Sequence, residues 1–375
     1  MRACVAVGAA LAAAGAFAAP SPGTGDVLTV RNAAELYAAL TGATPGQSIH
    51  ALGGIYELDR PLVVPDGVAL AGDGEMRVDA TGTPQGWESV VTTLRVSEPF
   101  VANVVTLGDG ASLRGLQIVQ RAVAPEQAAR AQAGGVDAPI DNIVVIASRR
   151  PADELSVTIR ECELVNPNPF SINPSGPGGR AIVVTTLHAD PPLVPATHVA
   201  AHLTVTIERS IVRSGDSNTL FAANFAPQAR IDLRLRNNLF EGLLSASGGV
   251  SRLDLVSDAT TTLESTHNVY VRTGTFDDLG WQLLGGSSAP HATTPTPGAF
   301  RNTLRVRSLD DRIEGFHVAV YAAAGRRVGE TSGAVSDNRM ELDMTGTTLR
   351  TLDASGADLS LHGCLLYTSP SPRDS

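Results

Sequence analysis

The stretch "ARIDLRLRNNLF", residues 229–240, decides the fold class because its apolar and polar side chains alternate. Ile231, Leu233 and Leu235 take every second position, and charged residues stand between them. Successive side chains of a β-strand point to opposite faces, so a strand gathers this apolar set on one face. Segments 155–162 and 203–210 repeat the pattern, with Gly, Pro, Asn and Ser clusters between strands. The sequence therefore predicts an all-β chain.

The strands share one register, which predicts a repeat. In four of them a small residue is followed two positions later by an apolar one; the four are Cys162, Ser210, Asn238 and Asn268. Their spacing fits a unit of about 28–30 residues, interrupted by one long insertion, and such a repeat is typical of a solenoid. The insertion is the Pro-rich segment 187–202.

The same alignment brings opposite charges into neighbouring coils. Glu161 and Arg209 precede the aligned position in two coils, and Arg160, Glu208 and Arg236 stand one residue earlier. Parallel strands lie about 4.8 Å apart, so we expect these side chains to be neighbours on the outer face. The aligned small residues then stack at a bend. Exposed ion pairs contribute only ~0–1 kcal/mol each, so they specify register more than stability.

The N-terminus predicts export. Residues 1–19 have one Arg, an apolar run and a small-residue end, with cleavage expected after Ala18 or Ala19, as in a secretory signal peptide. The alternative is an apolar helix that stays attached. A linker at 20–26 follows, and no later segment reaches the ~20 apolar residues of a membrane span. We expect a secreted or periplasmic protein.

Composition excludes some classes of function. The formal net charge is -10 and no basic stripe is visible, which disfavours nucleic acid as a partner. The chain has no Lys, so any mechanism that needs a lysine is excluded, and its Ala, Gly and Arg content is typical of a GC-rich bacterial genome. No disulfide framework is visible, and we expect Cys162 to fill a core or bend position as a small apolar group.

One stretch near the start resembles a known family. Residues 48–74, "SIHALGGIYELDRPLVVPDGVALAGDG", and 107–120 are similar to the opening coils of pectin-lyase-like right-handed parallel β-helix proteins. The matching positions of the first stretch are Gly54, Tyr56, Leu58, Pro65, Gly67, Val68, Leu70 and Gly72. Asn238 and Asn268 resemble the asparagine ladders of that fold. The resemblance covers 27–363 and implies a single right-handed parallel β-helix.

A helix cap is expected at the N-terminal end of this solenoid. A short strand at 27–30 is followed by a helical pattern at 32–40. Asn32 can cap that helix, and Glu35 stands at the capping-box position. The resemblance places such a helix over the first coil.

For function, the resemblance leaves two classes open. It implies that polysaccharide is bound or processed in the groove beside a parallel sheet, by a lyase or glycoside hydrolase if the chain is an enzyme. The alternative is a non-catalytic structural, adhesin-like or envelope-associated solenoid, because one scaffold serves many functions. No complete catalytic motif of the family is present. No cofactor is evident, and Ca²⁺ is implied only by the family.

Asp310 and Asp311 are the first candidate catalytic pair. With His317 nearby, two carboxyl groups have the chemistry of glycoside hydrolysis. The competing interpretation is a turn between two strands, where Asp is favoured for local hydrogen bonds. The pattern favours the turn.

A second group of candidates lies farther up the chain. Asp277 and Asp278 precede Trp281, and an aromatic ring beside carboxylates suggests a sugar subsite with Trp281 as the binding residue. Asp216 is a further candidate acid, although "RSGDSN" favours a turn there. His188, Asp190, His198 and His202 crowd the long insertion, but their spacing matches no metal motif, so no metal site is predicted.

The last residues differ from the rest of the chain. Cys364 to Ser375, "CLLYTSPSPRDS", resembles a transposon-end sequencing adapter translated in frame. On this interpretation the solenoid is truncated near Gly363, and its later coils and C-terminal cap are missing. An uncapped solenoid exposes an unpaired strand edge, so we expect fraying or aggregation from that end.

Overall fold

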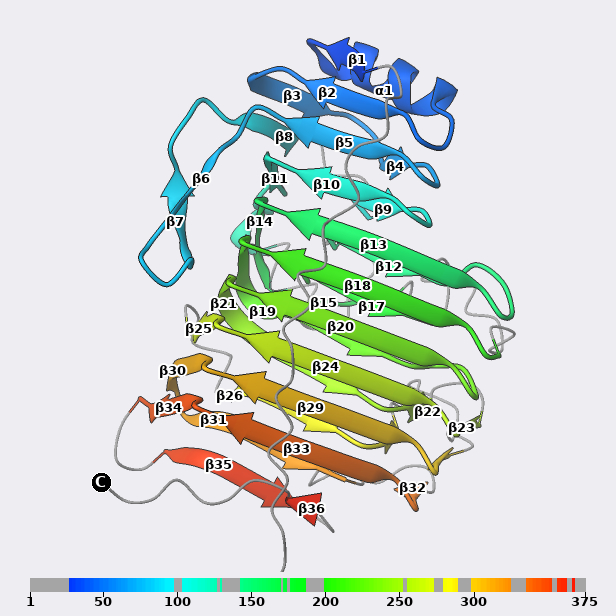
Figure 1. Ribbon diagram of the computed structural model, residues 1–375, viewed down its shortest axis with the longest axis vertical. Helices are drawn as coiled ribbons and strands as arrows, with labels where there is room; N and C mark the ends of the chain where they lie inside the picture. The colour runs from blue at the N-terminus through cyan, green and yellow to red at the C-terminus, as the bar shows by residue number, and fades with distance from the viewer. Residues whose placement is uncertain are drawn as a thin grey trace, which may run out of the picture.

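The fold is a solenoid of parallel strands (Figure 1). The computed structural model describes residues 27–97, 103–126, 129, 142–169, 171–173, 176–186, 199–251, 255–272, 279–288, 298–324, 335–352, 356–362 and 366–367. The strands facing the viewer in Figure 1 run from right to left while the chain descends, so the coil is right-handed. The predicted right-handed parallel β-helix is confirmed.

One face of the solenoid is an 11-stranded parallel sheet, here called sheet A. In spatial order its strands are β1 (Val27–Val30), β2 (Ser48–Ala51), β5 (Ala69–Gly72), β10 (Ser112–Arg114), β13 (Glu154–Arg160), β18 (His202–Glu208), β20 (Arg230–Arg236), β24 (Thr260–Thr266), β29 (Thr303–Leu309), β33 (Arg339–Thr345) and β36 (Leu366–Tyr367). Each coil adds one strand to this sheet.

The rest of each coil belongs to a 16-stranded sheet with two legs, here called sheet B. The first leg holds β3 (Gly54–Leu58), β8 (Thr92–Val96), β11 (Leu116–Val119), β14 (Glu163–Pro169), β25 (Val269–Val271), β30 (Arg312–Phe316) and β34 (Thr348–Thr351). The second holds β4 (Leu62–Val64), β9 (Val105–Leu107), β12 (Val144–Ala147), β17 (Ile182–Thr185), β26 (Leu279–Leu284), β31 (Val318–Ala323) and β35 (Ala357–His362). Two long strands pair with both legs, β19 (Ile211–Ala223) and β21 (Leu239–Ser247).

Nine short strands lie outside sheets A and B. Two antiparallel pairs are β6 (Met76–Val78) with β7 (Pro84–Trp87) and β15 (Ser171–Asn173) with β16 (Gly176–Gly178). The parallel groups are β22 (Val250–Ser251) with β27 (Ser287–Ser288), and β23 (Val256–Ser257) with β28 (Ala299–Phe300) and β32 (Val335–Ser336).

The register predicted from the repeat is confirmed. Arg160, Glu208 and Arg236 are paired across β13, β18 and β20 on the outer face of sheet A. One residue earlier in each strand, Ile159, Ile207 and Leu235 point inward and are buried in the core. Alternation thus fills the core with aliphatic side chains, which suits a chain with only 4% aromatic residues.

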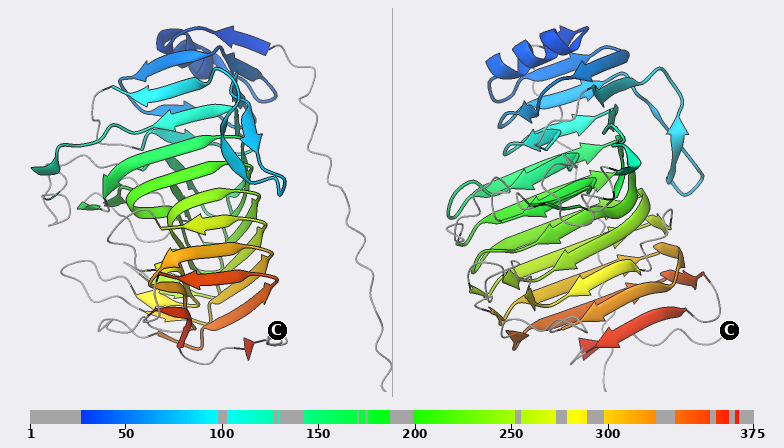
Figure 2. Two further views of the ribbon diagram at one scale, coloured as in Figure 1. Left: turned by 90° about the vertical axis from the view of Figure 1, so that its left-hand side faces the viewer. Right: turned by 180° about the vertical axis from the view of Figure 1, so that it is seen from behind.

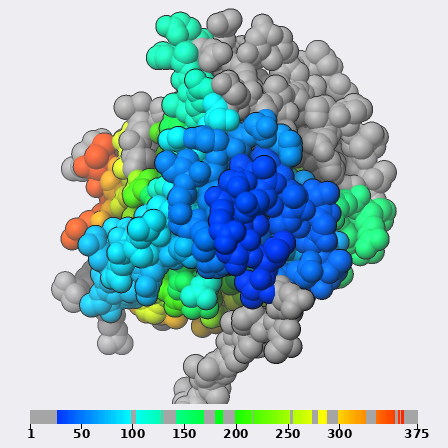
Figure 3. Space-filling model, turned by 90° about the horizontal axis from the view of Figure 1, so that it is seen from above, coloured from blue at the N-terminus to red at the C-terminus, as the bar shows by residue number. Residues whose placement is uncertain are grey.

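The predicted helix cap is also confirmed. The helix α1 (Ala33–Gly42) covers the first coil and buries Leu36 and Leu40. The Oδ1 of Asn32 accepts a hydrogen bond from the Glu35 backbone N–H at 2.9 Å, and the Asn32 Nδ2 donates to Glu35 Oε1 at 2.9 Å. Figure 3, which looks down the solenoid from this end, shows the cap in dark blue.

Left-handed backbone marks two bends, one on each side of sheet A. All eleven described non-glycine residues with positive φ fall at these bends. Those before the sheet A strands are Ala152, Ala200, Gln228, Asp258, Arg301 and Asp337, and those after them are Glu161, Arg209, Asn237, His267 and Asp310. The left-handed conformation lets the chain turn within two residues, so sheet A stays flat and in register.

Side-chain ladders satisfy the backbone inside both bends. Along the second bend the N–H of Cys162 donates to Ser210 Oγ at 3.2 Å, that of Ser210 to Asn238 Oδ1 at 2.9 Å and that of Asn238 to Asn268 Oδ1 at 2.9 Å. The Asn268 N–H donates to Asp311 Oδ1 at 2.7 Å. A buried N–H without a hydrogen-bond acceptor is destabilising, and each ladder side chain accepts a hydrogen bond from a backbone N–H at the bend.

A hairpin arm leaves the coil between β5 and β8. The arm comprises residues 74–90 and contains the antiparallel strands β6 and β7. It runs along the side of the solenoid past the following coils (Figure 2). Its Trp87 Nε1 donates to Glu163 Oε2 at 2.7 Å, and its Thr81 carbonyl accepts from Asn237 Nδ2 at 2.8 Å. The arm therefore contacts several coils that are distant from it in the sequence.

Candidate functional site

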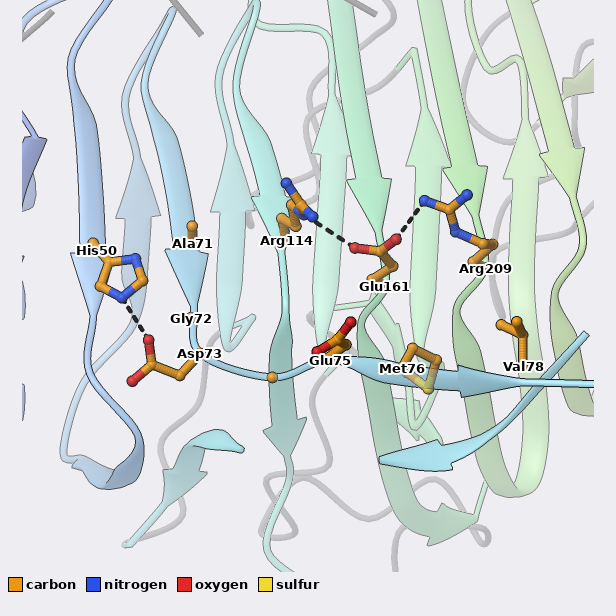
Figure 4. A pocket seen from close by; sticks show the side chains of 11 residues that line it. His50, Ala71, Gly72, Asp73, Glu75, Met76, Val78, Arg114, Glu161 and Arg209 are labelled. Atoms are coloured by element: carbon orange, nitrogen blue, oxygen red, sulfur yellow. Dashed lines mark hydrogen bonds and ion pairs between the residues drawn. The ribbon is translucent and has the colours of Figure 1, made fainter. Parts of the chain in front are cut away.

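A pocket of about 590 Å³ lies between the arm and the edge of sheet A (Figure 4). The solenoid side is formed by residues at the ends of β2, β5 and β10 and at the bends after β13 and β18. The lining residues are His50, Ala71, Gly72, Asp73, Gly74, Glu75, Met76, Val78, Arg114, Glu161 and Arg209. The bend after sheet A and the arm together position these side chains.

Glu161 is held between two arginines. Arg114 Nε lies 3.0 Å from Glu161 Oε2, and Arg209 pairs with Oε1 of the same carboxylate. Burial favours a raised pKa of Glu161, but the charges and hydrogen bonds of Arg209 and Arg114 outweigh it and lower the pKa. Glu161 is therefore ionised at neutral pH. A guanidinium has five N–H groups, so both arginines keep donors for a ligand.

The end of the pocket nearest the helix cap holds a second paired carboxylate. His50 Nε2 lies 2.6 Å from Asp73 Oδ1, and the Gly53 N–H donates to Asp73 Oδ2 at 2.6 Å. Glu75 projects into the pocket from the arm, and Met76 and Val78 add apolar surface beside it (Figure 4). The pocket thus offers one carboxylate on the arm side, both donors and acceptors on the solenoid side, and a small apolar surface.

This arrangement can bind polar groups, and the carboxylate held between its two arginines is a poor proton donor. Glycoside hydrolysis by two carboxyl groups needs one that keeps its proton near neutral pH. The pKa of Glu161 is lowered, whereas burial raises the pKa of Asp311, which lies in the core ladder away from the pocket. Neither Glu161 nor Asp311 is therefore suited to supply such an acid to the pocket.

The described residues also do not fit the calcium that the family resemblance implied. Calcium takes six to eight oxygen ligands. The part of the chain that the structure describes has no group of three or more His, Cys, Asp or Glu placed to hold a metal. The pocket carboxylates of Glu161 and Asp73 are already paired with arginine and histidine.

The prediction that Asp310 and Asp311 act as a catalytic pair is wrong. Asp310 has a φ of 54° at the second bend, and its exposed carboxylate lies 3.5 Å from His267 Nε2. Asp311 is fully buried and accepts hydrogen bonds from Asn268 and from Ser308 Oγ at 2.6 Å. The two side chains point to opposite sides of the chain, and the turn interpretation is correct.

Trp281 cannot contact a sugar in this structure, which corrects the predicted subsite. Its side chain is fully buried in the core, 5.1 Å from the ring of Tyr270 in an edge-to-face arrangement. Asp277 and Asp278 lie outside the described residues. Asp216 lies within strand β19, paired with Pro169, so the turn predicted there is wrong; the structure does not describe its side chain.

His202 is the described member of the predicted histidine cluster. Its ring bridges two carboxylates on the outer face of sheet A, with Nδ1 3.0 Å from Glu154 and Nε2 2.9 Å from Asp232. His188, Asp190 and His198 lie outside the described residues.

The sequence predicted some members of the pocket and missed others. Glu161 and Arg209 were expected as charged neighbours in adjacent coils, and they are. Arg114, His50 and Asp73 were missed because the alignment of coils did not extend to β2, β5 and β10. The signal that would have located the pocket is the polar, Gly-rich stretch 72–90, which interrupts the repeat and forms the arm.

In comparison with solved structures, the chain shows weak similarity to several proteins. No family model and no curated protein matches it. A solved alginate lyase from Paenibacillus sp. str. FPU-7 is 13% identical and aligns over 90% of this chain and 98% of its own, with a TM-score of 0.37. A polygalacturonase from Erwinia carotovora ssp. carotovora is 11% identical over 91% and 97%, with a TM-score of 0.41.

A third solved structure, a pectin methylesterase in complex with a hexasaccharide, is 10% identical over 89% of this chain and 94% of its own, with a TM-score of 0.42. At these identities the similarity assigns no activity. For the described residues, no helix is long and apolar enough to cross a membrane.

Proposed function

We propose that this chain is a secreted or periplasmic protein that binds polysaccharide in the pocket beneath the arm. The observation that carries the proposal is that the pocket wall repeats with the coils. His50, Ala71 and Arg114 are paired in register across β2, β5 and β10, and Glu161 and Arg209 take equal bend positions in the next two coils. Five coils at about 4.8 Å spacing make a polar wall roughly 19 Å long.

An elongated, repeating ligand suits such a wall. Each coil presents one side chain to the pocket at the end of its sheet A strand, so an extended chain lying along the solenoid could contact several coils at once. Three carboxylates and two guanidiniums line the pocket, which disfavours a polyanion such as nucleic acid. Paired acids and arginines instead offer acceptors and donors for neutral hydroxyl groups.

Binding without cleavage is the function that the described residues support best. Arg114 and Arg209 hold the Glu161 carboxylate and lower its pKa, which favours a role in binding over one as a proton donor. Secretion rests on the signal-peptide pattern at 1–19, which lies outside the described residues.

The test is a binding screen with a product assay. The purified chain is run against neutral and acidic polysaccharides by affinity electrophoresis, and each mixture is assayed for reducing ends and unsaturated products. Arg114→Ala and Arg209→Ala should abolish retardation. Arg305→Ala is the matched control, because Arg305 also pairs with a glutamate on sheet A, Glu341 at 3.2 Å, but lies outside the pocket.

The outcomes separate three possibilities. Retardation that only the pocket variants lose supports binding beneath the arm. Product formation would show an enzyme and overturn the non-catalytic proposal. A folded protein that binds none of the polymers would favour the second candidate, a structural solenoid, which the continuous eleven-stranded ladder of sheet A supports as a stiff rod.

A further inference from the structure

We propose that the arm is a strap, fixed at its root, whose tip lifts from the solenoid to admit a chain from the side. The arm forms one wall of the pocket with Glu75, Met76 and Val78, whereas Arg114, Glu161 and Arg209 belong to the coils. Glu75 and Met76 lie at the root end of the arm and Val78 next to its tip, so lifting the tip would move Val78 and open the end of the pocket nearest to it, leaving Arg114, Glu161 and Arg209 in place. The inference rests on the proposed function only for the nature of the ligand.

The root of the arm is closely packed. The Gly74 N–H donates to the Gly115 carbonyl at 3.1 Å, and a Cβ added at Gly74 would lie 2.4 Å from Cζ3 of Trp87. Gly115 has a left-handed φ of 64°, and a Cβ there would lie 2.8 Å from the carbonyl oxygens of Gly72 and Gly74. Side-chain substitution at this junction is sterically blocked, so the root has little room to move.

A hydrogen bond to a buried carboxylate secures the returning strand. Trp87 donates to Glu163, which is 4% exposed and pairs with Arg213. Gln117 Nε2 donates to the same Glu163 Oε2 at 2.8 Å. Breaking the Trp87 contact would leave a buried carboxylate with one fewer donor, so this end of the arm stays attached.

The tip is rigid within itself, and between described residues it is joined to the coils by one hydrogen bond and by the attraction of Asp79 to Arg312. Asp79 Oδ1 accepts from the N–H groups of Thr81 at 2.8 Å and Thr83 at 3.0 Å, and the Gly82 N–H donates to the Asp79 carbonyl at 3.0 Å. These bonds move with the tip. The bond to the body is Asn237 Nδ2 to the Thr81 carbonyl, at 2.8 Å. The weakest connection is thus at the far end of the arm.

Hydrogen exchange on the full chain tests the strap without any ligand. Asn237→Gly removes the tip contact, and glycine keeps the left-handed φ of 53° that this bend position requires. Exchange of arm amides 75–86 should rise about fivefold, the factor that corresponds to one net hydrogen bond. His267→Gly is the matched control: it changes the same bend position one coil later, where the side chain faces Asp310 rather than the arm.

The result that would overturn the strap is equal exchange of arm amides in Asn237→Gly and wild type, or a rise of the same size in the root and in sheet A. The wild-type protein provides a second measurement, because its tip amides should exchange faster than the Gly74 amide at the root. A polysaccharide that binds should slow arm exchange. If Asn237→Gly frees the tip but no polysaccharide slows it, the strap stands and the proposed ligand class is wrong.

Discussion

Asp311 offers the sharpest test of how the solenoid is held together. Its carboxylate takes the place that Asn268 takes one coil earlier, and it accepts the buried Asn268 N–H at 2.7 Å. Asp311→Ala removes that acceptor and leaves the N–H without a partner. Ser308 loses a contact as well, although its hydroxyl keeps Thr347 Oγ1 at 2.6 Å. The orphaned N–H and the small cavity should together cost about 2–4 kcal/mol.

Asp311→Asn is the matched variant, because it keeps the acceptor and removes the charge. One coil earlier, Asn268 Nδ2 donates to Ser265 Oγ at 2.9 Å, and Ser265 and Ser308 are paired in register. The new amide at position 311 can therefore donate to Ser308 in the same way. The ladder then continues with asparagine. We expect this variant to be at least as stable as wild type at neutral pH.

The pH dependence follows from burial, which raises the pKa of Asp311 above its ordinary 3.8. A raised carboxyl pKa means that the folded state holds the proton more tightly than the unfolded state. Wild type therefore loses stability as pH rises from near 3.8 through the folded-state pKa. The advantage of Asp311→Asn should therefore be smaller at about pH 4 than at about pH 8.

Equilibrium urea unfolding, followed by circular dichroism at both pH values, measures these differences. The ladder assignment would be refuted if Asn were as destabilising as Ala, or if the difference between Asn and wild type did not change with pH. Either result would mean that the carboxylate does something that an amide acceptor cannot do.

Three further outcomes are expected. Glu161→Gln should lower the free energy of unfolding by up to about 1 kcal/mol at neutral pH. The lowered pKa of Glu161 contributes stability that is present above its ordinary pKa of 4.5 and is lost as pH falls through the folded-state pKa. Urea unfolding in strong acid should therefore show no difference between the variant and wild type. Trp281→Ala should cost about 3–5 kcal/mol because it empties a fully buried core site, with Trp87→Ala on the arm as the milder control in thermal melts. Burial raises the pKa of the Cys162 thiol to about 12, so a thiol reagent should label Cys162 only in denaturant. Because the chain also has Cys4 and Cys364, the labelled peptide is identified by mass spectrometry, and rapid labelling of Cys162 in native protein would contradict its core placement.

The fold is predictable from the sequence because each coil uses the same residue types at the same positions: apolar residues that face the core and small polar residues at the bend. Alternation in β20 predicted which residues are buried, and the aligned Ser210, Asn238 and Asn268 predicted the ladder. The alignment does not reach the ladder's next member, Asp311, because a longer coil separates it from Asn268, by 43 residues. A fixed repeat length hides a rung when the coil between two rungs carries an insertion.

The candidate site was less predictable because it depends on a contact between distant segments. Trp281 stood near two carboxylates in sequence, but strand alternation turns it inward against Tyr270. Arg114 and Glu161 are 47 residues apart and meet because their coils are adjacent. The arm that closes the pocket leaves no periodic signal, since its position is set by side-chain hydrogen bonds to later coils.

Both ladders point in one direction along the solenoid. At the second bend, the backbone N–H groups from Cys162 to Asn268 donate to a side chain of the next coil, the last one to Asp311. At the first bend, the N–H of Ala259 donates to Asn302 Oδ1 and that of Asn302 to Asn338 Oδ1. During synthesis, the backbone N–H groups at the bends of the newest coil therefore have no ladder acceptor until the next coil is made. Growth from the capped N-terminal end would proceed as a zipper in which each new coil completes the previous one.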